Sequence, residues 1–127
     1  MYRGGQRLFC DDLETKPLPN DPLILVTGAS GYVGGRLVTE LLARGYRTRA
    51  MFRLPQVPHP RTWKGVEVVY ADSREPDQLR QALRHVDVAY YLIHSLGVRR
   101  QDFETPDLVA ASNFRAVAAE CGVKRII

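Results

Sequence analysis

The stretch that decides the fold is LILVTGASGYVGGRLVTELLARG, residues 23–45. It opens with a short apolar run, Leu23–Val26, which is typical of a strand buried on both faces. Glycines spaced three apart follow at Gly28, Gly31 and Gly34. Apolar residues then recur at helical spacing, namely Val33, Leu37, Val38, Leu41 and Leu42, and Gly45 follows as a natural C-terminal cap. The most flexible residues of the segment therefore lie between a predicted buried strand and a predicted helix.

Each of these glycines has a predicted part in binding a pyrophosphate. Gly28 lets the chain turn sharply off the strand, Gly31 lets the backbone approach the ligand without a Cβ in the way, and Gly34 allows close helix packing. The amides of the first helical turn, from Gly31 through Tyr32 to Val33, would face the phosphates with the positive end of the helix dipole behind them. The alternative is a tight strand–helix turn that binds nothing.

The end of the second predicted strand bears on the choice between NAD and NADP. NAD-selective sites usually place a carboxylate there to accept from the ribose 2′-hydroxyl, whereas this sequence ends the strand with Met51, Phe52 and Arg53. A guanidinium grips a 2′-phosphate bidentately, and Ser30 in the glycine loop would add a hydroxyl donor. The pattern favours NADP over NAD. The alternative for Arg53 is a solvent-facing residue at a strand end.

The rest of the sequence alternates between strand and helix patterns. Further strands are predicted over residues 47–53, 66–72 and 86–93, with a fifth opening at Lys124. Helices are predicted from Pro76, burying Leu79, Ala82 and Leu83, and from Thr105-Pro106 to Gly122, burying Ala110, Phe114, Val117 and Cys121. Three prolines between the second and third strands argue against a regular helix there. Together these predict an α/β, doubly wound parallel sheet of order 3-2-1-4-5, ending at its fifth strand.

Two polar residues away from the glycine loop are further candidates. Asp72 ends the third predicted strand, where it would either accept from an adenine amino group or cap the turn before Pro76; both interpretations stay open. Asn113 is a polar residue among alanines in the last predicted helix. Its amide would hydrogen-bond across to the loop of a neighbouring strand, with or without a part in the site.

The end of the fourth predicted strand supplies the remaining candidates. Tyr90 and Tyr91 point to opposite faces and are predicted to be core residues. Ile93 reaches the sheet edge where ligands bind in such folds. His94 and Ser95 would lie beside the nicotinamide ribose, which makes them weak catalytic candidates. The alternative for His94 is a loop histidine bonded to backbone.

The length, composition and charge of the chain narrow the classes of protein to which it could belong. The chain has 127 residues, 45% of them hydrophobic and 25% charged, which suits one globular domain, predicted at residues 23–127 after a flexible tail at 1–22. No apolar run approaches the roughly 20 residues that span a bilayer, and no signal peptide is evident, so we expect a cytoplasmic protein without membrane contact. Cys10 and Cys121 give neither a disulfide framework nor a metal site. The net charge of +4 comes from basic residues scattered among carboxylates, so we expect no nucleic-acid partner.

With these residues in place, the chain resembles the atypical and extended short-chain dehydrogenase/reductase families, in particular their NmrA-like and nucleoside-diphosphate-sugar-epimerase-like members. Three segments carry the resemblance: LVTGASGYVGGRLVTELLARGYRTRAMFR (25–53), VEVVYADSREPDQLRQALRHVDVAYYLIHSLG (66–97) and NFRAVAAECGVKRII (113–127). It implies a Rossmann-fold NAD(P)-binding domain with the pyrophosphate at the glycines, the 2′-phosphate at Arg53 and the adenine at Asp72. In such families a Ser/Thr and a Tyr-x-x-x-Lys pair follow the fifth strand, so catalytic residues are expected beyond Ile127. No lysine of this chain has a tyrosine four residues before it.

The resemblance leaves two functions open. One is an oxidoreductase or sugar-nucleotide epimerase/dehydratase, of which this chain would be the cofactor-binding portion without the C-terminal substrate part. The other is a non-catalytic, NmrA-like redox sensor that binds the dinucleotide and regulates partners. In either case we expect no turnover by this portion alone. The unpaired edge of its fifth strand would favour self-association.

Overall fold

The computed structural model describes residues 19–55, 59–93 and 106–127. The described strands are β1 (Leu23–Val26), β2 (Arg47–Phe52), β3 (Glu67–Tyr70), β4 (Val88–Tyr90) and β5 (Arg125–Ile126). The described helices are α1 (Tyr32–Ala43), α2 (Pro76–Ala82) and α3 (Pro106–Glu120). Each element falls within or beside a range predicted from the sequence. The predicted cap at Thr105 lies outside the described residues.

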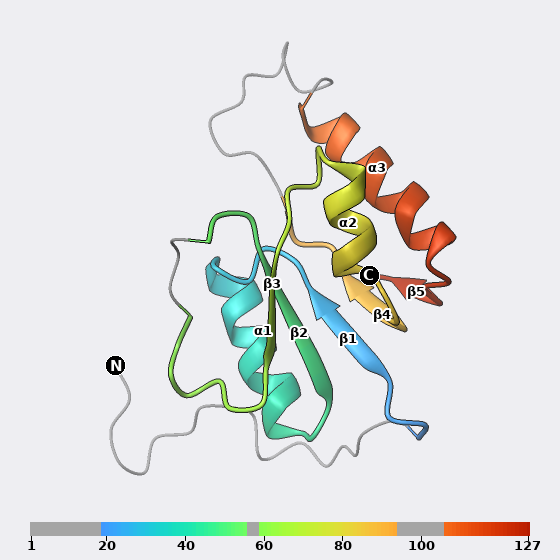
Figure 1. Cartoon of the computed structure of the whole chain (residues 1–127). Helices are drawn as coiled ribbons and strands as arrows, with labels where there is room; N and C mark the ends of the chain where they lie inside the picture. The colour runs from blue at the N-terminus through green and yellow to red at the C-terminus, as the bar shows by residue number, and fades with distance from the viewer. Residues whose placement is uncertain (1–18, 56–58, 94–105) are drawn as a thin grey trace.

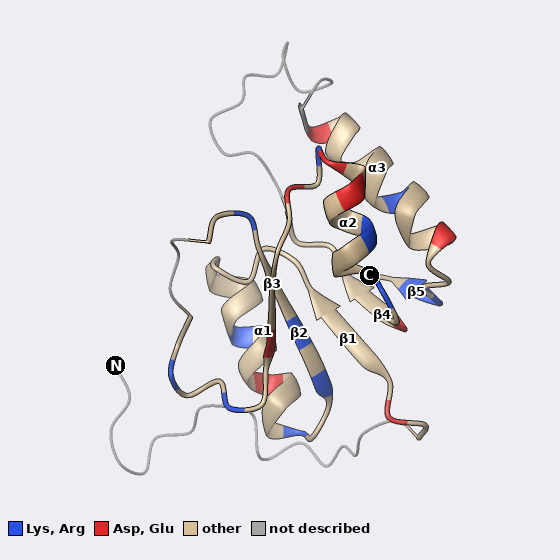
Figure 2. Cartoon of the chain, viewed as in Figure 1, with Lys and Arg blue, Asp and Glu red and all other residues tan. Residues whose placement is uncertain are grey.

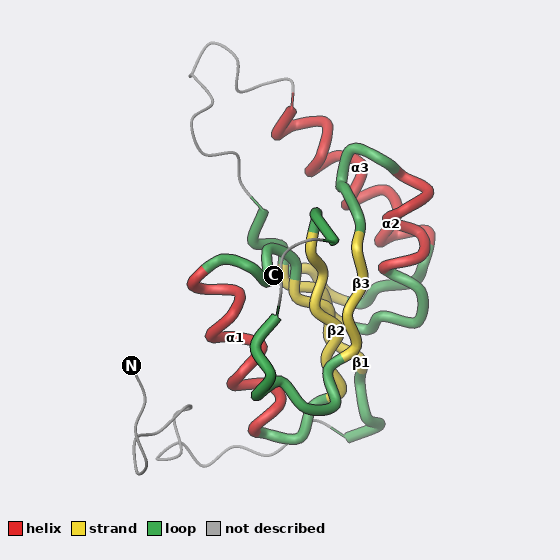
Figure 3. The backbone as a smooth tube through the Cα atoms, turned by 60° about the vertical axis from the view of Figure 1, so that its left-hand side comes forward, coloured by secondary structure: helices red, strands yellow, loops and turns green. Residues whose placement is uncertain are grey.

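The strands form one parallel sheet in the order β3-β2-β1-β4-β5, which confirms the predicted topology (Figure 1). Helix α1 covers one face of the sheet, and α2 and α3 cover the other (Figure 3). The strand order reverses at β1, because the chain passes from β3 at one edge to β4 on the far side of β1. In such sheets the crevice at the carboxyl ends of the strands flanking this point is where ligands bind.

The core has one apolar layer on each side of the sheet. Leu25, Leu79 and Phe114 belong to the layer under α2 and α3, and Val26 and Val38 belong to the layer under α1. Tyr90 and Tyr91 pack against opposite layers, as the sequence predicts. Strands with apolar residues on both faces are expected when helices cover both sides of a parallel sheet.

Helix α1 follows the prediction at its end and departs from it at its start. Gly45 adopts φ +84° and the Tyr46 amide donates to the Leu41 carbonyl at 3.0 Å, a C-terminal cap that favours glycine. Val33, predicted as part of the apolar stripe, is 63% exposed, so that part of the prediction is wrong. The buried face of the helix instead follows Gly34, Val38 and Leu41 at positions i, i+4 and i+7. Val33 lies about 100° around the helix from Gly34, which turns it away from the core.

The proline-rich crossover between β2 and β3 contains no helix in its described residues. A buried tryptophan covers this part of the sheet instead. The Trp63 ring lies 6.2 Å from that of Phe52 between centroids, and its Nε1 donates to the Thr39 Oγ1 of α1 at 3.1 Å.

On the other face, Arg80 of α2 donates from Nε to Glu120 Oε2 of α3 at 2.9 Å, and charges of both signs lie along these two helices (Figure 2). Among the described residues, no helix combines the length and apolar character needed to cross a bilayer.

Candidate functional site

The turn between β1 and α1 is built around two glycines that a larger residue would disrupt. Gly28 adopts φ +61°, and a Cβ there would lie 2.9 Å from the Leu92 carbonyl oxygen. A Cβ at Gly34 would collide with the Gly28 carbonyl group and lie 3.1 Å from the Ala29 Cα. Gly28 thus makes the predicted sharp turn, and Gly34 lets α1 pack tightly onto that turn.

Gly31 differs from these two because nothing in the described part of the chain requires it to be glycine. Its φ of −82° suits any residue, and an added Cβ would approach only the Gly28 carbonyl oxygen, at an ordinary 3.4 Å. The residue is exposed and lines the cavity described below. The free space above its backbone therefore faces that cavity.

The start of α1 exposes backbone donors, although not the full set predicted. Gly31 is the N-cap and provides no side-chain cap to the helix. Its own amide donates to the Gly28 carbonyl at 3.0 Å, so the prediction of a free amide at Gly31 is wrong: the tight turn uses it. The amides of Tyr32, Val33 and Gly34 have no acceptor among the described residues. An anion at this helix start would meet unpaired N–H groups and the positive end of the dipole.

Gly31, which directly precedes these donors, lines a cavity of about 540 Å³ at the carboxyl edge of the sheet. Its lining includes six residues predicted for the site, namely Gly28, Ser30, Gly31, Arg53, Asp72 and Ile93. Tyr32, Val33 and Gly34 are not in the lining, and the Tyr32 side chain is 85% exposed. The other lining residues were not predicted for the site from the sequence: Met51, Ala71, Ser73, Arg74, Leu92, Asp107 and Ala110. Ends of four strands thus meet at one cavity.

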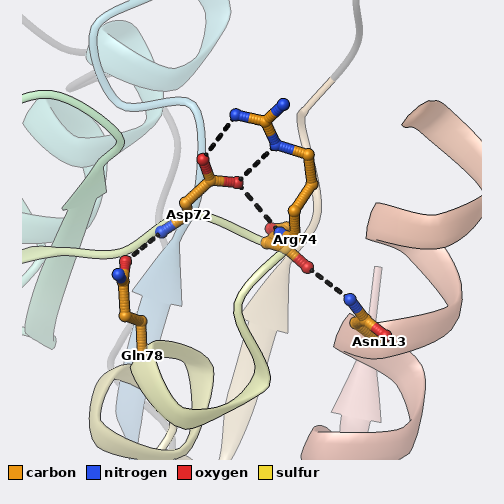
Figure 4. Close-up of polar contacts among 5 residues, drawn as sticks. Asp72, Arg74, Gln78 and Asn113 are labelled. Atoms are coloured by element: carbon orange, nitrogen blue, oxygen red, sulfur yellow. Dashed lines mark hydrogen bonds and ion pairs between the residues drawn. The ribbon is translucent and has the colours of Figure 1, made fainter.

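On the β3 side, Asp72 is held by a bidentate ion pair with Arg74 (Figure 4). Arg74 Nε and Nη2 donate to Asp72 Oδ1 and Oδ2 at 3.1 and 2.8 Å, and the Arg74 backbone amide donates to Oδ1 at 2.9 Å. Asp72 therefore caps its own turn, one of its two predicted roles, while its side chain also lines the cavity. The hydrogen bond from the Arg74 guanidinium holds the pKa of Asp72 below its usual range against the opposing effect of partial burial, and the charge of Arg53 adds to the lowering.

Two helices fix the backbone on either side of this ion pair (Figure 4). Gln78 of α2 accepts from the Asp72 amide through Oε1 at 2.8 Å. Asn113 of α3 donates through Nδ2 to the Ser73 carbonyl at 3.0 Å, which confirms the predicted hydrogen bond across to a neighbouring strand's loop. The β3 end of the cavity is thereby anchored to both helices on that face.

On the β4 side, the buried Thr27 joins the ends of β1 and β4. Its Oγ1 donates to the Tyr90 carbonyl at 2.9 Å and accepts from the Leu92 amide at 2.7 Å. Sequence reasoning missed this residue, although a hydroxyl directly after an apolar strand is a usable signal.

The weak catalytic candidates His94 and Ser95 lie outside the described residues. Within the described part of the chain, no cluster of His, Cys, Asp and Glu suits a metal ion.

The topology and the glycine turn together define the class: a Rossmann-type α/β domain whose first helix begins at the switch point of the sheet. The NmrA-like family matches residues 20–127, and the chain belongs to that family. It is 33% identical over 106 residues to sterol demethylase protein B of Methylococcus capsulatus, covering 81% of this chain and 32% of that protein. It is 28% identical to cinnamoyl-CoA reductase 1 of Petunia hybrida, covering 83% and 34%.

A solved structure shows the same fold. A short-chain dehydrogenase/reductase superfamily protein from Agrobacterium tumefaciens, crystallised with bound NAD, superposes with a TM-score of 0.67 at 23% identity. The match covers 82% of this chain and 31% of that one. The chain thus spans about a third of the length of the relatives it matches.

Proposed function

We propose that this chain binds NADP at the carboxyl edge of its sheet, as the cofactor-binding part of an oxidoreductase or sugar-nucleotide-modifying enzyme. The observation that carries the proposal is the start of α1, where the amides of Tyr32, Val33 and Gly34 have no acceptor among the described residues, next to a cavity that Gly31 lines. A pyrophosphate supplies the negative charge and acceptor oxygens that such a helix start binds. A relative that is named as a reductase, and a solved structure of similar fold that holds NAD, support this function.

The cavity suggests how the cofactor lies across the sheet. With the pyrophosphate at the start of α1, the adenosine half extends over the ends of β2 and β3, toward Arg53 and Asp72. The nicotinamide half extends over the end of β4, where Ile93 lines the cavity. The bound dinucleotide would supply hydride-transfer chemistry, and the residues of this chain would hold and orient it.

Replacing Gly31 by alanine tests the pyrophosphate site. The structure accommodates the new methyl group, so folding is retained, but the methyl occupies the space that the phosphates need. We expect the NADPH dissociation constant of Gly31→Ala to rise by about tenfold or more in a fluorescence titration. Gly35→Ala is the matched control, because its methyl makes only ordinary contacts at 3.6 and 3.8 Å and Gly35 is not in the cavity lining. Equal affinities for the two variants would contradict the proposal.

Replacing Arg53 tests the choice of NADP. Arg53 lines the cavity, is exposed, and has no hydrogen bond or ion pair to any residue that the structure describes. Its guanidinium is therefore available for a 2′-phosphate. We expect Arg53→Ala to weaken NADPH binding by about tenfold while changing NADH binding by less than about twofold. Equal losses for both cofactors would refute the role of Arg53.

The family match favours one second candidate, a dinucleotide-binding regulator without turnover. Both candidates use the same cavity, so a binding assay does not separate them. An assay of NADPH oxidation with carbonyl substrates separates the two candidates. It uses the longest protein that the reading frame encodes. Turnover identifies an enzyme, whereas binding that changes association with a partner protein, without turnover, identifies a regulator.

A further inference from the structure

We propose that Arg74 is a positioning residue for NADP selectivity: by neutralising Asp72 it leaves Arg53 free to bind the 2′-phosphate. The inference rests on the proposed function and adds to it a specificity-determining residue that acts through another side chain. It concerns the adenosine half of the cavity, where an acid and two arginines from neighbouring strand ends line one space.

The sheet register brings Arg53 and Asp72 together. Phe52 and Tyr70 are paired across β2 and β3, and the Ala71 amide donates to the Phe52 carbonyl at 2.9 Å. Arg53 and Asp72 therefore leave the sheet at adjacent strand ends, and both line the cavity. The positive charge of Arg53 contributes to the lowered pKa of Asp72, in keeping with this proximity.

Arg74 uses the carboxylate that would otherwise pair with Arg53. It makes three hydrogen bonds to Asp72, two from the guanidinium and one from the backbone amide (Figure 4). Bidentate pairing of this kind fixes both oxygens and cancels the local negative charge. Arg53, by contrast, has no carboxylate partner among the residues that the structure describes. The anchoring of Asp72 by Gln78 and of Ser73 by Asn113 keeps the carboxylate in place.

An uncompensated carboxylate at this position would oppose NADP in two ways. It would draw the Arg53 guanidinium toward itself, and it would repel a 2′-phosphate through like charge. Neither effect weakens binding of NAD, whose ribose carries a neutral 2′-hydroxyl in place of the charged phosphate. The Asp72–Arg74 pair therefore makes the end of β3 favour NADP over NAD.

The test measures NADPH and NADH dissociation constants for Arg74→Gln and for the double variant that combines it with Asp72→Asn. We expect Arg74→Gln to raise the NADPH constant by about tenfold and to change the NADH constant by less than about threefold. Adding Asp72→Asn should restore the NADPH constant to within about threefold of the starting protein, because no carboxylate is left to capture Arg53. Arg61→Gln, which removes the same charge from an exposed site outside the cavity lining, should change neither constant by more than about twofold.

Three results would overturn the inference, and each has a different meaning. Equal losses of both cofactors in Arg74→Gln, with a lowered melting temperature, would show a structural role only. Failure of the double variant to recover NADPH binding would show that Arg74 does not act through the Asp72 carboxylate. If the starting protein binds neither cofactor, the proposed function fails first, and the role of Arg74 fails with it.

Discussion

At the scale of single residues, Thr27 shows how the edge of the cavity is held. Its hydroxyl satisfies the Leu92 amide and also donates to the Tyr90 carbonyl, while the residue itself is fully buried. Thr27→Val keeps the shape of the side chain and removes both hydrogen bonds, which leaves the Leu92 amide without its partner. We expect the free energy of unfolding to fall by about 1–3 kcal/mol, measured by urea denaturation.

Thr27→Ser is the control, because it keeps the hydroxyl and loses one buried methyl group. It should retain slow hydrogen exchange at the Leu92 amide, whereas Thr27→Val should lose that protection. Equal exchange rates in the two variants would show that the hydroxyl does not hold the end of β4.

Prediction of single residues from the sequence succeeded where the spacing of residues along the chain fixes their place in the fold. Gly28 and Gly34 stand where the turn and the close helix packing require them, and Arg53 and Asp72 line one cavity because their strands end at one edge. Arg74 was missed, because an ion pair between residues two apart in a turn depends on side-chain orientation that no periodicity encodes. The free amide predicted at Gly31 was wrong for a similar reason: the tightness of the turn decides where that N–H points.

At the scale of elements, a buried arginine joins β2 to the end of α2. Arg49 is 7% exposed, and its Nη1 donates to the Ala82 and Arg84 carbonyls at 2.6 and 2.8 Å. Its Nε lies 3.1 Å from Glu67 Oε1, in an ion pair whose angles do not make a hydrogen bond. A cation at a helix C-terminus satisfies carbonyls that have no partner within the helix.

We expect Arg49→Met to lower the free energy of unfolding by about 2–4 kcal/mol, because it leaves carbonyls at the end of α2 without their charged donor. Chemical denaturation followed by the fluorescence of Trp63, the one tryptophan of the chain, measures the change. Arg47→Met is the matched control on the same strand. Its side chain is 55% exposed and pairs with Asp21 at 3.6 Å, so the cost should stay within about 0.5 kcal/mol. Similar costs for both variants would contradict the anchoring role of Arg49.

The elements themselves were predictable because each has a strong local signal. Apolar runs mark β1 and β4, helical stripes mark α1 and α3, and Pro76 marks the start of α2. The burial of Arg49 had no such signal, because its partners lie 33 and 35 residues further along the chain. Likewise, the prolines of the β2–β3 crossover predicted the lack of a helix there, but not that Trp63 would cover that part of the sheet.

At the scale of the whole molecule, the site exists only because the sheet brings four strand ends together. Strand β1 supplies the glycine turn, β2 and β3 supply the charged residues, and β4 supplies Leu92 and Ile93. The order of strands followed from alternation and the handedness of crossovers, so the position of the cavity was predictable. The substrate was not, because the chain spans about a third of the length of its relatives.

The most direct test of the account is a ¹⁵N–¹H NMR titration of the chain with NADPH. We predict that the largest amide shifts fall on Tyr32, Val33 and Gly34, whose N–H groups would receive the pyrophosphate. The amides of Gly45 and Gly122 lie just past the C-terminal ends of α1 and α3, so their chemical shifts should not change. Binding that shifts other amides and leaves the start of α1 unchanged, or no binding at all, would contradict the account.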